Sequence, residues 1–240
     1  MLSSKIRRAL SSKRQLPLPL KRHGGKRPGS GRKPGPGPRR SSHKTRPLVT
    51  ARWPVHVTVR MERDVPGLRN FRRAQVLRRA FVKACVKPGF KICQFSIQGN
   101  HIHLVCEAID RQALASGIQG WAVRVARGIN RAVGRKGKLF FDRYYVTVIK
   151  TPSQMRNTLC YVLQNARRHR ERIDRRFGGV DPFSSGWWFD GWRDNAWRAG
   201  QSPPEMRTVA EAETWLLRVG WKKARFGLIA IDEVPPAAGA

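Results

Sequence analysis

Two histidines separated by one apolar residue, His101 and His103, are the side chains of this sequence best suited to bind a metal ion. On a β-strand, residues i and i+2 project from the same face, so both imidazoles would lie side by side while Ile102 turns into the core. Imidazole is the commonest protein ligand for divalent transition metals. The pair supplies half of such a site, although an exposed or hydrogen-bonded pair has the same spacing.

A possible nucleophile lies on a later helix. The apolar residues from Met155 to Ala166 form one helical stripe, and Tyr161 and Asn165 fall on roughly the opposite face, one turn apart. A tyrosine kept for packing would lie in the stripe, so Tyr161 is a candidate for chemistry. Tyr144 and Tyr145 are the only other tyrosines of the chain.

These residue types suit an attack on a DNA phosphate. When a tyrosine displaces a DNA strand, the energy of the broken phosphodiester bond is conserved in a phosphotyrosine linkage, so that rejoining needs no ATP. Because a phenol has a pKa near 10, a cation or a base must assist. Two imidazoles and the amide oxygen of Asn165 would provide mixed nitrogen and oxygen ligation, which allows Mg²⁺ or Mn²⁺.

Composition indicates the partner. The 240 residues carry 49 Lys and Arg against 15 acids, a net charge of +34, which favours a polyanion such as nucleic acid over a membrane surface. No apolar run approaches the length of a membrane span, and the start lacks the apolar stretch of a secretory signal, although its Arg- and Ser-rich composition also fits an organelle transit peptide. The four scattered cysteines predict neither a disulfide framework nor a zinc knuckle. We expect a cytoplasmic, nucleoid-associated protein.

The chain divides into three predicted parts: a disordered basic arm (1–50), a nuclease domain (51–178), and a Trp-rich C-terminal appendage with a tail (179–240). The arm holds 15 Lys or Arg and no acid. Within it, the segment containing Lys26, Arg27, Arg32 and Lys33 resembles an AT-hook for the DNA minor groove, and a plain flexible linker has the same composition. The tryptophans of the appendage, with a helix around 210–219, suit either a compact core or base stacking.

The central part predicts an α+β fold. Period-2 strands are expected near 55–61, 93–97, 102–106 and 139–149, and helical stripes at 71–85 and 114–132. The order β-α-β-β-α-β is that of a ferredoxin-like antiparallel sheet with both helices on one face, leaving the other face available for a site. A further helix begins after Thr151, where Pro152 and Gln154 give a capping box.

Three segments carry a family resemblance. His101-Ile102-His103, Gly137 to Tyr144 and Tyr161-Val162-Leu163-Gln164-Asn165 resemble the HUH single-tyrosine transposases, and within them the REP-associated branch of the IS200-like transposases. The resemblance implies cleavage and rejoining of single-stranded, hairpin-associated DNA through a 5′-phosphotyrosine intermediate. It implies metal ligation by His101, His103 and Asn165, with Gln164 as the alternative ligand, and Tyr161 as the nucleophile.

Two points stay open at this stage. Arg143 is a phosphate contact or a surface partner of Asp142. A catalytically silent nucleic-acid-binding protein on the same scaffold is the alternative function, since ferredoxin-like sheets also serve for binding alone. The sequence does not distinguish a monomer from a dimer.

Overall fold

The computed structural model describes residues 46–169, 178–202 and 204–235, all within one compact unit of residues 40–240. The basic arm, with Lys26, Arg27, Arg32 and Lys33, lies almost wholly outside the described residues, so its predicted disorder and DNA contacts stay predictions. The predicted domain boundaries at 50 and 178 likewise stay predictions. No helix in the described ranges is long and apolar enough to cross a bilayer.

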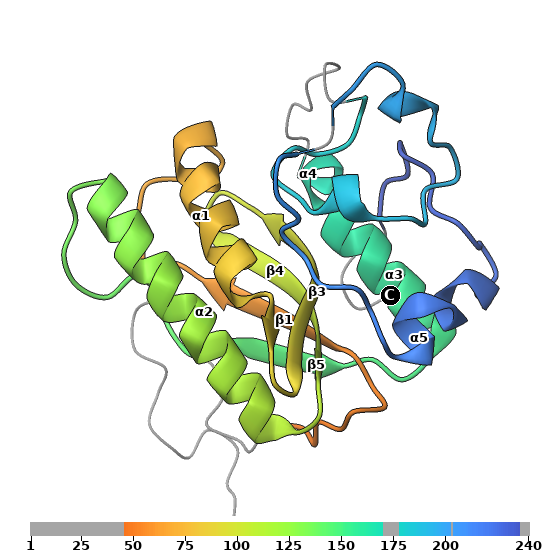
Figure 1. The fold of residues 1–240 in the computed structure, drawn as a ribbon, viewed down its shortest axis with the longest axis horizontal. Coiled ribbons are helices and arrows are strands. Elements are labelled where there is room, and N and C mark those ends of the chain that lie inside the picture. Colours follow the sequence, from red (N-terminus) through yellow and green to blue (C-terminus); the bar gives the residue numbers. More distant parts are fainter. Residues whose placement is uncertain (1–45, 170–177, 203, 236–240) are drawn as a thin grey trace, which may run out of the picture. The chain divides into compact units, whose positions relative to one another are not determined.

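A five-stranded antiparallel sheet forms the centre of the structure, in the order β2-β3-β4-β1-β5 (Figure 1). The predicted ferredoxin-like order β-α-β-β-α-β is confirmed, and the short β2 is an addition that pairs with the start of β3. The elements are β1 (Val55–Arg60), α1 (Phe71–Ala84), β2 (Val86–Lys87), β3 (Phe90–Ile97), β4 (His101–Ala108), α2 (Arg111–Ala132) and β5 (Tyr145–Val148).

Helices α1 and α2 cover one face of the sheet (Figure 1). Side-chain oxygens of Asn70 and Asp110 accept hydrogen bonds from the first free backbone N–H groups of α1 and α2, respectively, which fixes where each helix begins. The main core lies between these helices and the inward-facing residues of the strands, with Trp121 fully buried. A Cβ on Gly117 would lie 2.2 Å from the ring of Phe90, so α2 approaches the sheet closely at that glycine.

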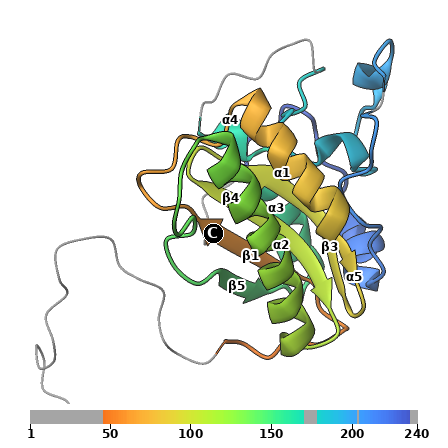
Figure 2. The same cartoon turned by 60° about the vertical axis from the view of Figure 1, so that its left-hand side comes forward.

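The other face of the sheet is covered rather than open (Figure 2). Helix α3 (Pro152–Leu163) packs there with α4 (Asn165–Arg168) and with the segment from residue 178 onward, around a second apolar core that includes Trp192 and Trp221. Two of the tryptophans of the C-terminal region, Trp192 and Trp221, therefore form part of a compact core, which was one of the two roles expected from the sequence. The candidate site lies within this second layer, beside α3.

Three predicted elements differ from the structure because tertiary contacts redefine them. The strand expected over 139–149 is reduced to β5, since Phe140 forms only an isolated bridge with Met61. The helix expected over 152–166 is interrupted at Gln164. The helix expected around 210–219 is only α5 (Trp215–Arg218), because the carboxylate of Glu107 accepts hydrogen bonds from the backbone N–H groups just before it.

The C-terminal segment is fastened to the sheet and its helices at several points. Residues 183–185 hydrogen-bond to β3 along the part of its edge that β2 leaves uncovered, which protects that edge from pairing with other chains. Arg69 forms a two-point ion pair with the buried Asp181, at 2.9 and 3.0 Å. Arg156 of α3 forms another with Glu233. These contacts hold the second layer against the sheet.

Candidate active site

The histidine pair lies at the start of β4, and the predicted alternation holds. His101 and His103 face the α3 side of the sheet, while Ile102 between them is fully buried in the main core. Across the antiparallel β1–β4 pair, Thr58 lies opposite His103 and Arg60 lies opposite His101. The strand register therefore places polar residues of β1 beside both imidazoles.

Four of the six histidines of the chain form one cluster here. The ring centroids of His101 and His103 are 4.7 Å apart, those of His56 and His103 are 5.1 Å apart, and those of His101 and His169 are 6.3 Å apart. Sequence reasoning assigned no role to His56 or His169. The signal for His56 was present, because it alternates with buried valines on β1 and so had to face the same side as Thr58.

The imidazoles in the centre of this cluster are neutral at physiological pH. Burial lowers the pKa of His56 to about 4. Burial, together with electrostatic interaction with His169 and Arg60, lowers the pKa of His101 to about 4. Burial and the neighbouring histidines lower the pKa of His103 to about 2. A neutral imidazole is the form that can coordinate a cation.

Hydrogen bonds select which ring nitrogen is left for a ligand. His101 Nδ1 lies 2.8 Å from Asn100 Oδ1, so the Nδ1–H donates to that oxygen. His103 Nδ1 lies 3.1 Å from both His56 Nε2 and Thr58 Oγ1. Nδ1 is engaged in each ring, so Nε2 of His101 keeps its lone pair. Nε2 of His103 keeps its lone pair in the tautomer whose Nδ1–H donates to His56 Nε2 or Thr58 Oγ1, which is the arrangement that orients metal-binding histidines.

Helix α3 presents Tyr161 to the same cluster. The helix begins as predicted, since Thr151 Oγ1 accepts from Gln154 N at 3.2 Å, and Gln154 Oε1 accepts from Lys150 N, one residue before the cap. The ring of Tyr161 meets that of His103 edge-on with centroids 5.1 Å apart, and the ring of His56 at 6.1 Å. The structure thus brings the predicted nucleophile and the predicted histidine pair together.

The two amide side chains that follow Tyr161 differ in their surroundings. Gln164 Nε2 donates to the backbone oxygens of Ala230 and Ile231, and its Oε1 accepts from Arg167, so this side chain fastens the C-terminal segment. Asn165 is fully buried, and neither atom of its amide has a hydrogen-bond partner among the described residues. Asn165 therefore retains the donor atom that a metal ion requires, and Gln164 does not.

Buried polar atoms that lack a hydrogen-bond partner indicate which of these residues could bind a cation. Besides the Asn165 amide, His103 Nε2 is buried without a hydrogen-bond partner in the described ranges. Leaving a buried polar group unpaired costs about 1–3 kcal/mol, so both groups fit a role in binding a ligand. In the described part of the chain, no group of three or more His, Cys, Asp or Glu is arranged to hold a metal ion. The predicted ligand set has only two such residues, His101 and His103, and its third ligand is the amide of Asn165.

The other two tyrosines lie in different environments. Tyr144 is half-buried, and Arg46 both donates to its phenol oxygen at 2.8 Å and stacks over its ring. Burial raises the pKa of Tyr144 despite the nearby guanidinium. Tyr145 is 66% exposed and pairs with Thr58, so it lies on the histidine face of the sheet, one strand further out.

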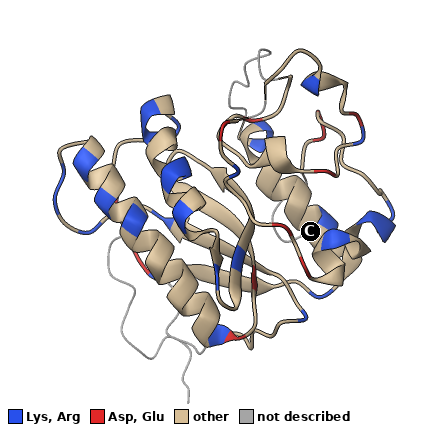
Figure 3. Cartoon of the chain, viewed as in Figure 1, with Lys and Arg blue, Asp and Glu red and all other residues tan. Residues whose placement is uncertain are grey.

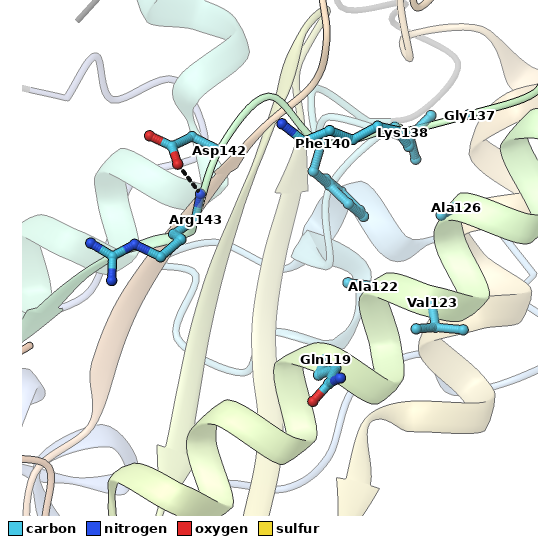
Figure 4. A pocket seen from close by; sticks show the side chains of 10 residues that line it. Gln119, Ala122, Val123, Ala126, Gly137, Lys138, Phe140, Asp142 and Arg143 are labelled. Carbon is cyan, nitrogen blue, oxygen red and sulfur yellow. Dashed lines mark hydrogen bonds between the residues drawn. The ribbon is translucent and has the colours of Figure 1, made fainter. Parts of the chain in front are cut away.

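Arg143 lies beside a pocket of about 580 Å³ between α2 and the segment 137–143 (Figure 4). Its backbone N–H donates to Asp142 Oδ1 at 2.7 Å, and its exposed side chain points away from the α2 residues that line the opposite wall (Figure 4). Arg60, which sequence reasoning did not select, is also exposed and lies directly opposite His101. Arg60 is the last residue of β1, and Arg143 lies in the loop just before β5, the strand that pairs with β1.

Comparison with protein families identifies one match. Residues 52–165 match the family model described as "Transposase IS200 like". The match begins just before β1, spans the five strands with α1, α2 and α3, and ends at Asn165. The segment from residue 178 onward lies outside it.

Two solved structures align with part of the chain. A REP-associated tyrosine transposase bound to a REP hairpin shares 18% sequence identity, with a TM-score of 0.48 over 60% of this chain and 82% of that chain. A proposed transposase from Deinococcus radiodurans shares 12% identity, with a TM-score of 0.36 over 56% of this chain and 100% of that chain. No protein of curated function matches the sequence.

Proposed function

Since residues 52–165 belong to the IS200-like transposase family, we propose that this protein cleaves and rejoins single-stranded DNA at hairpins, with Tyr161 as the nucleophile. The observation that carries the proposal is the edge-on contact of Tyr161 with His103, at 5.1 Å between ring centroids. It places a phenol beside the one imidazole whose Nε2 is buried and without a partner among the described residues. Both residues lie within the matched range.

In the proposed reaction the phenol oxygen of Tyr161 attacks a backbone phosphorus atom of the DNA. A bond forms between that oxygen and phosphorus, and the bond to the 3′ oxygen breaks, so the phenol loses its proton and the released strand ends in a 3′-hydroxyl. A 3′-hydroxyl of the same or another strand then attacks the phosphotyrosine and releases Tyr161. Because one phosphodiester replaces another, no energy source is consumed.

We assign the other residues roles that suit their chemistry. His101, His103 and Asn165 would hold a divalent cation, Mg²⁺ or Mn²⁺, which when bound would polarise the scissile phosphate and offset the charge that develops on it. His56 and Thr58 hold the ring of His103 through Nδ1. Arg60 and Arg143 would contact backbone phosphates of the bound DNA.

A covalent-adduct assay tests this function. The protein is incubated with a labelled DNA hairpin carrying single-stranded flanks and with Mg²⁺ or Mn²⁺, and a protein–DNA species is sought on a denaturing gel. We expect an adduct with the wild type and none with Tyr161→Phe. Tyr145→Phe is the matched control and should keep the adduct, because Tyr145 lies on the same face but on the outer strand. Loss of the adduct in Tyr145→Phe alone would assign the nucleophile to that residue instead.

A further inference from the structure

A cavity of about 600 Å³ lies between α1 and the C-terminal segment, and the C-terminal wall lies outside the family match. Three tryptophans line it together with polar and cationic side chains of α1. The rings of Trp187 and Trp197 pack edge-to-face with centroids 5.1 Å apart, and all three tryptophans are only partly buried. The aromatic and cationic residues that line the cavity are Trp187, Trp188, Trp197, Arg78 and Arg79.

The walls of this tryptophan cavity are fixed by polar contacts. Arg78 donates to the backbone oxygen of Pro182. The carboxylate of Asp181, which also lines the cavity, is paired with Arg69 and fully buried. Trp197 Nε1 is buried and has no hydrogen-bond partner within the described ranges. The cavity therefore offers aromatic surface and positive charge. Of its two acids, Asp181 is neutralised by Arg69, and Glu205 is exposed.

A second hollow of about 620 Å³ runs between α1 and α2. Five cationic side chains and no acid line this cationic groove: Arg79, Lys83, Arg124, Arg127 and Arg131. Lys and Arg residues recur along the outer surfaces of both helices (Figure 3). Arg79 and Met206 line both the tryptophan cavity and the cationic groove, so the two hollows adjoin.

We propose that the tryptophan cavity and the cationic groove together form a second DNA site, which binds single-stranded DNA flanking the hairpin. Bases stack on the tryptophans, and the backbone phosphates follow the groove from Arg79 toward Arg131. Aromatic platforms beside a positive track are the features that bind single strands, whereas a duplex has no unstacked base to place in the cavity. The cationic groove lies on the α1–α2 face of the sheet, opposite the face that carries Tyr161, and the tryptophan cavity lies between α1 and the C-terminal segment. We assign this second site the positioning of DNA and no part in cleavage. It rests on the proposed function only for the choice of DNA as the nucleic acid.

Binding measurements on the full chain test the proposal. Fluorescence anisotropy in EDTA compares a blunt DNA hairpin with the same hairpin carrying a ten-thymidine extension. For the wild type the extension should tighten binding. Trp187→Ala should lower the affinity for the extended DNA roughly tenfold, which is the loss expected for one base stack. The affinity for the blunt hairpin should not change. Trp187→Phe should restore most of the loss.

The groove has its own readout, which does not depend on altering the C-terminal segment. Joint replacement of Arg124, Arg127 and Arg131 by alanine should lower the salt slope of binding to the extended DNA by about 2, since each phosphate contact contributes roughly 0.7 for a single strand. Arg79 is exposed on α1, so Arg79→Ala is expected to fold and to weaken binding of the extension alone.

Matched controls lie on α5, outside both hollows. Trp215→Ala and Arg218→Ala remove an exposed tryptophan and an exposed arginine and should leave every binding curve unchanged. An extension effect that persists in both Trp187→Ala and Arg79→Ala would overturn the proposal, and so would tighter binding of an RNA extension than of the DNA one. Adduct formation by the wild type on the hairpin with single-stranded flanks, measured in parallel with Mn²⁺, reports on the proposed function separately, because the anisotropy measurements are made in EDTA and do not require cleavage.

Discussion

Replacing Asn165 by leucine separates a metal-binding role from a structural one. The two side chains have similar volumes, and leucine has no polar atom to satisfy. In the structure the Asn165 amide is fully buried without a hydrogen-bond partner among the described residues. Such a group costs about 1–3 kcal/mol, so its removal should stabilise the metal-free protein by that amount. For a unit of residues 40–240, this corresponds to a Tm increase of roughly 2–12 °C.

The same substitution should abolish function. Without the amide oxygen, we expect no covalent adduct and a much smaller gain in Tm on adding Mn²⁺. For the wild type, Mn²⁺ at 100 times its Kd should add about 2.7 kcal/mol to the free energy of unfolding. Thermal denaturation of both proteins, in EDTA and in Mn²⁺, gives all four values. A metal-free Asn165→Leu protein that is less stable than the wild type by 1 kcal/mol or more would refute this reasoning, because it would mean that the amide has a structural partner.

Three further predictions concern the residues around the site. His103→Ala should abolish adduct formation while leaving most charge-driven DNA binding intact, as measured by anisotropy in EDTA. His56→Leu should raise the Mn²⁺ concentration needed for adduct formation roughly 10- to 100-fold, the usual effect of losing a residue that orients a ligand. Burial alone would raise the pKa of Glu233, but hydrogen bonds from Arg156 and Cys160 outweigh it and lower the pKa. The ion pair therefore stabilises the fold above the unfolded-state pKa of about 4.3 and is lost as the pH falls through the folded-state pKa, so the Tm deficit of Glu233→Gln should shrink below about pH 4.

Local spacing was sufficient to predict much of the site. The His101–His103 alternation and the position of Tyr161 depend only on the period of one strand and one helix, and both hold in the structure. His56 joins the cluster through the pairing register of β1 with β4, which sets two strands distant in sequence against each other. A periodic pattern indicates which face a residue occupies, and it does not indicate its neighbour on the next strand.

The interruption of α3 shows why helix ends were harder to predict. The apolar stripe continues through Ala166, but Gln164 leaves helical geometry and its amide donates to Ala230, 66 residues further along the chain. Other long-range hydrogen bonds, from the backbone N–H groups of Glu213 and Thr214 to the carboxylate of Glu107, shorten the predicted C-terminal helix to α5. In both places hydrogen bonds to distant segments outweigh the local preference for a helix.

The polarity of the covalent adduct tests the central claim most directly. A hairpin DNA labelled at its 3′ end, and the same DNA labelled at its 5′ end, are each incubated with the protein and Mn²⁺, and the adduct is digested and mapped by mass spectrometry. The account predicts that only the 3′-labelled fragment stays with the protein, joined through its 5′ phosphate to Tyr161, while the 5′-labelled fragment is released with a 3′-hydroxyl. Attachment through a 3′ phosphate, or to any residue other than Tyr161, would contradict it.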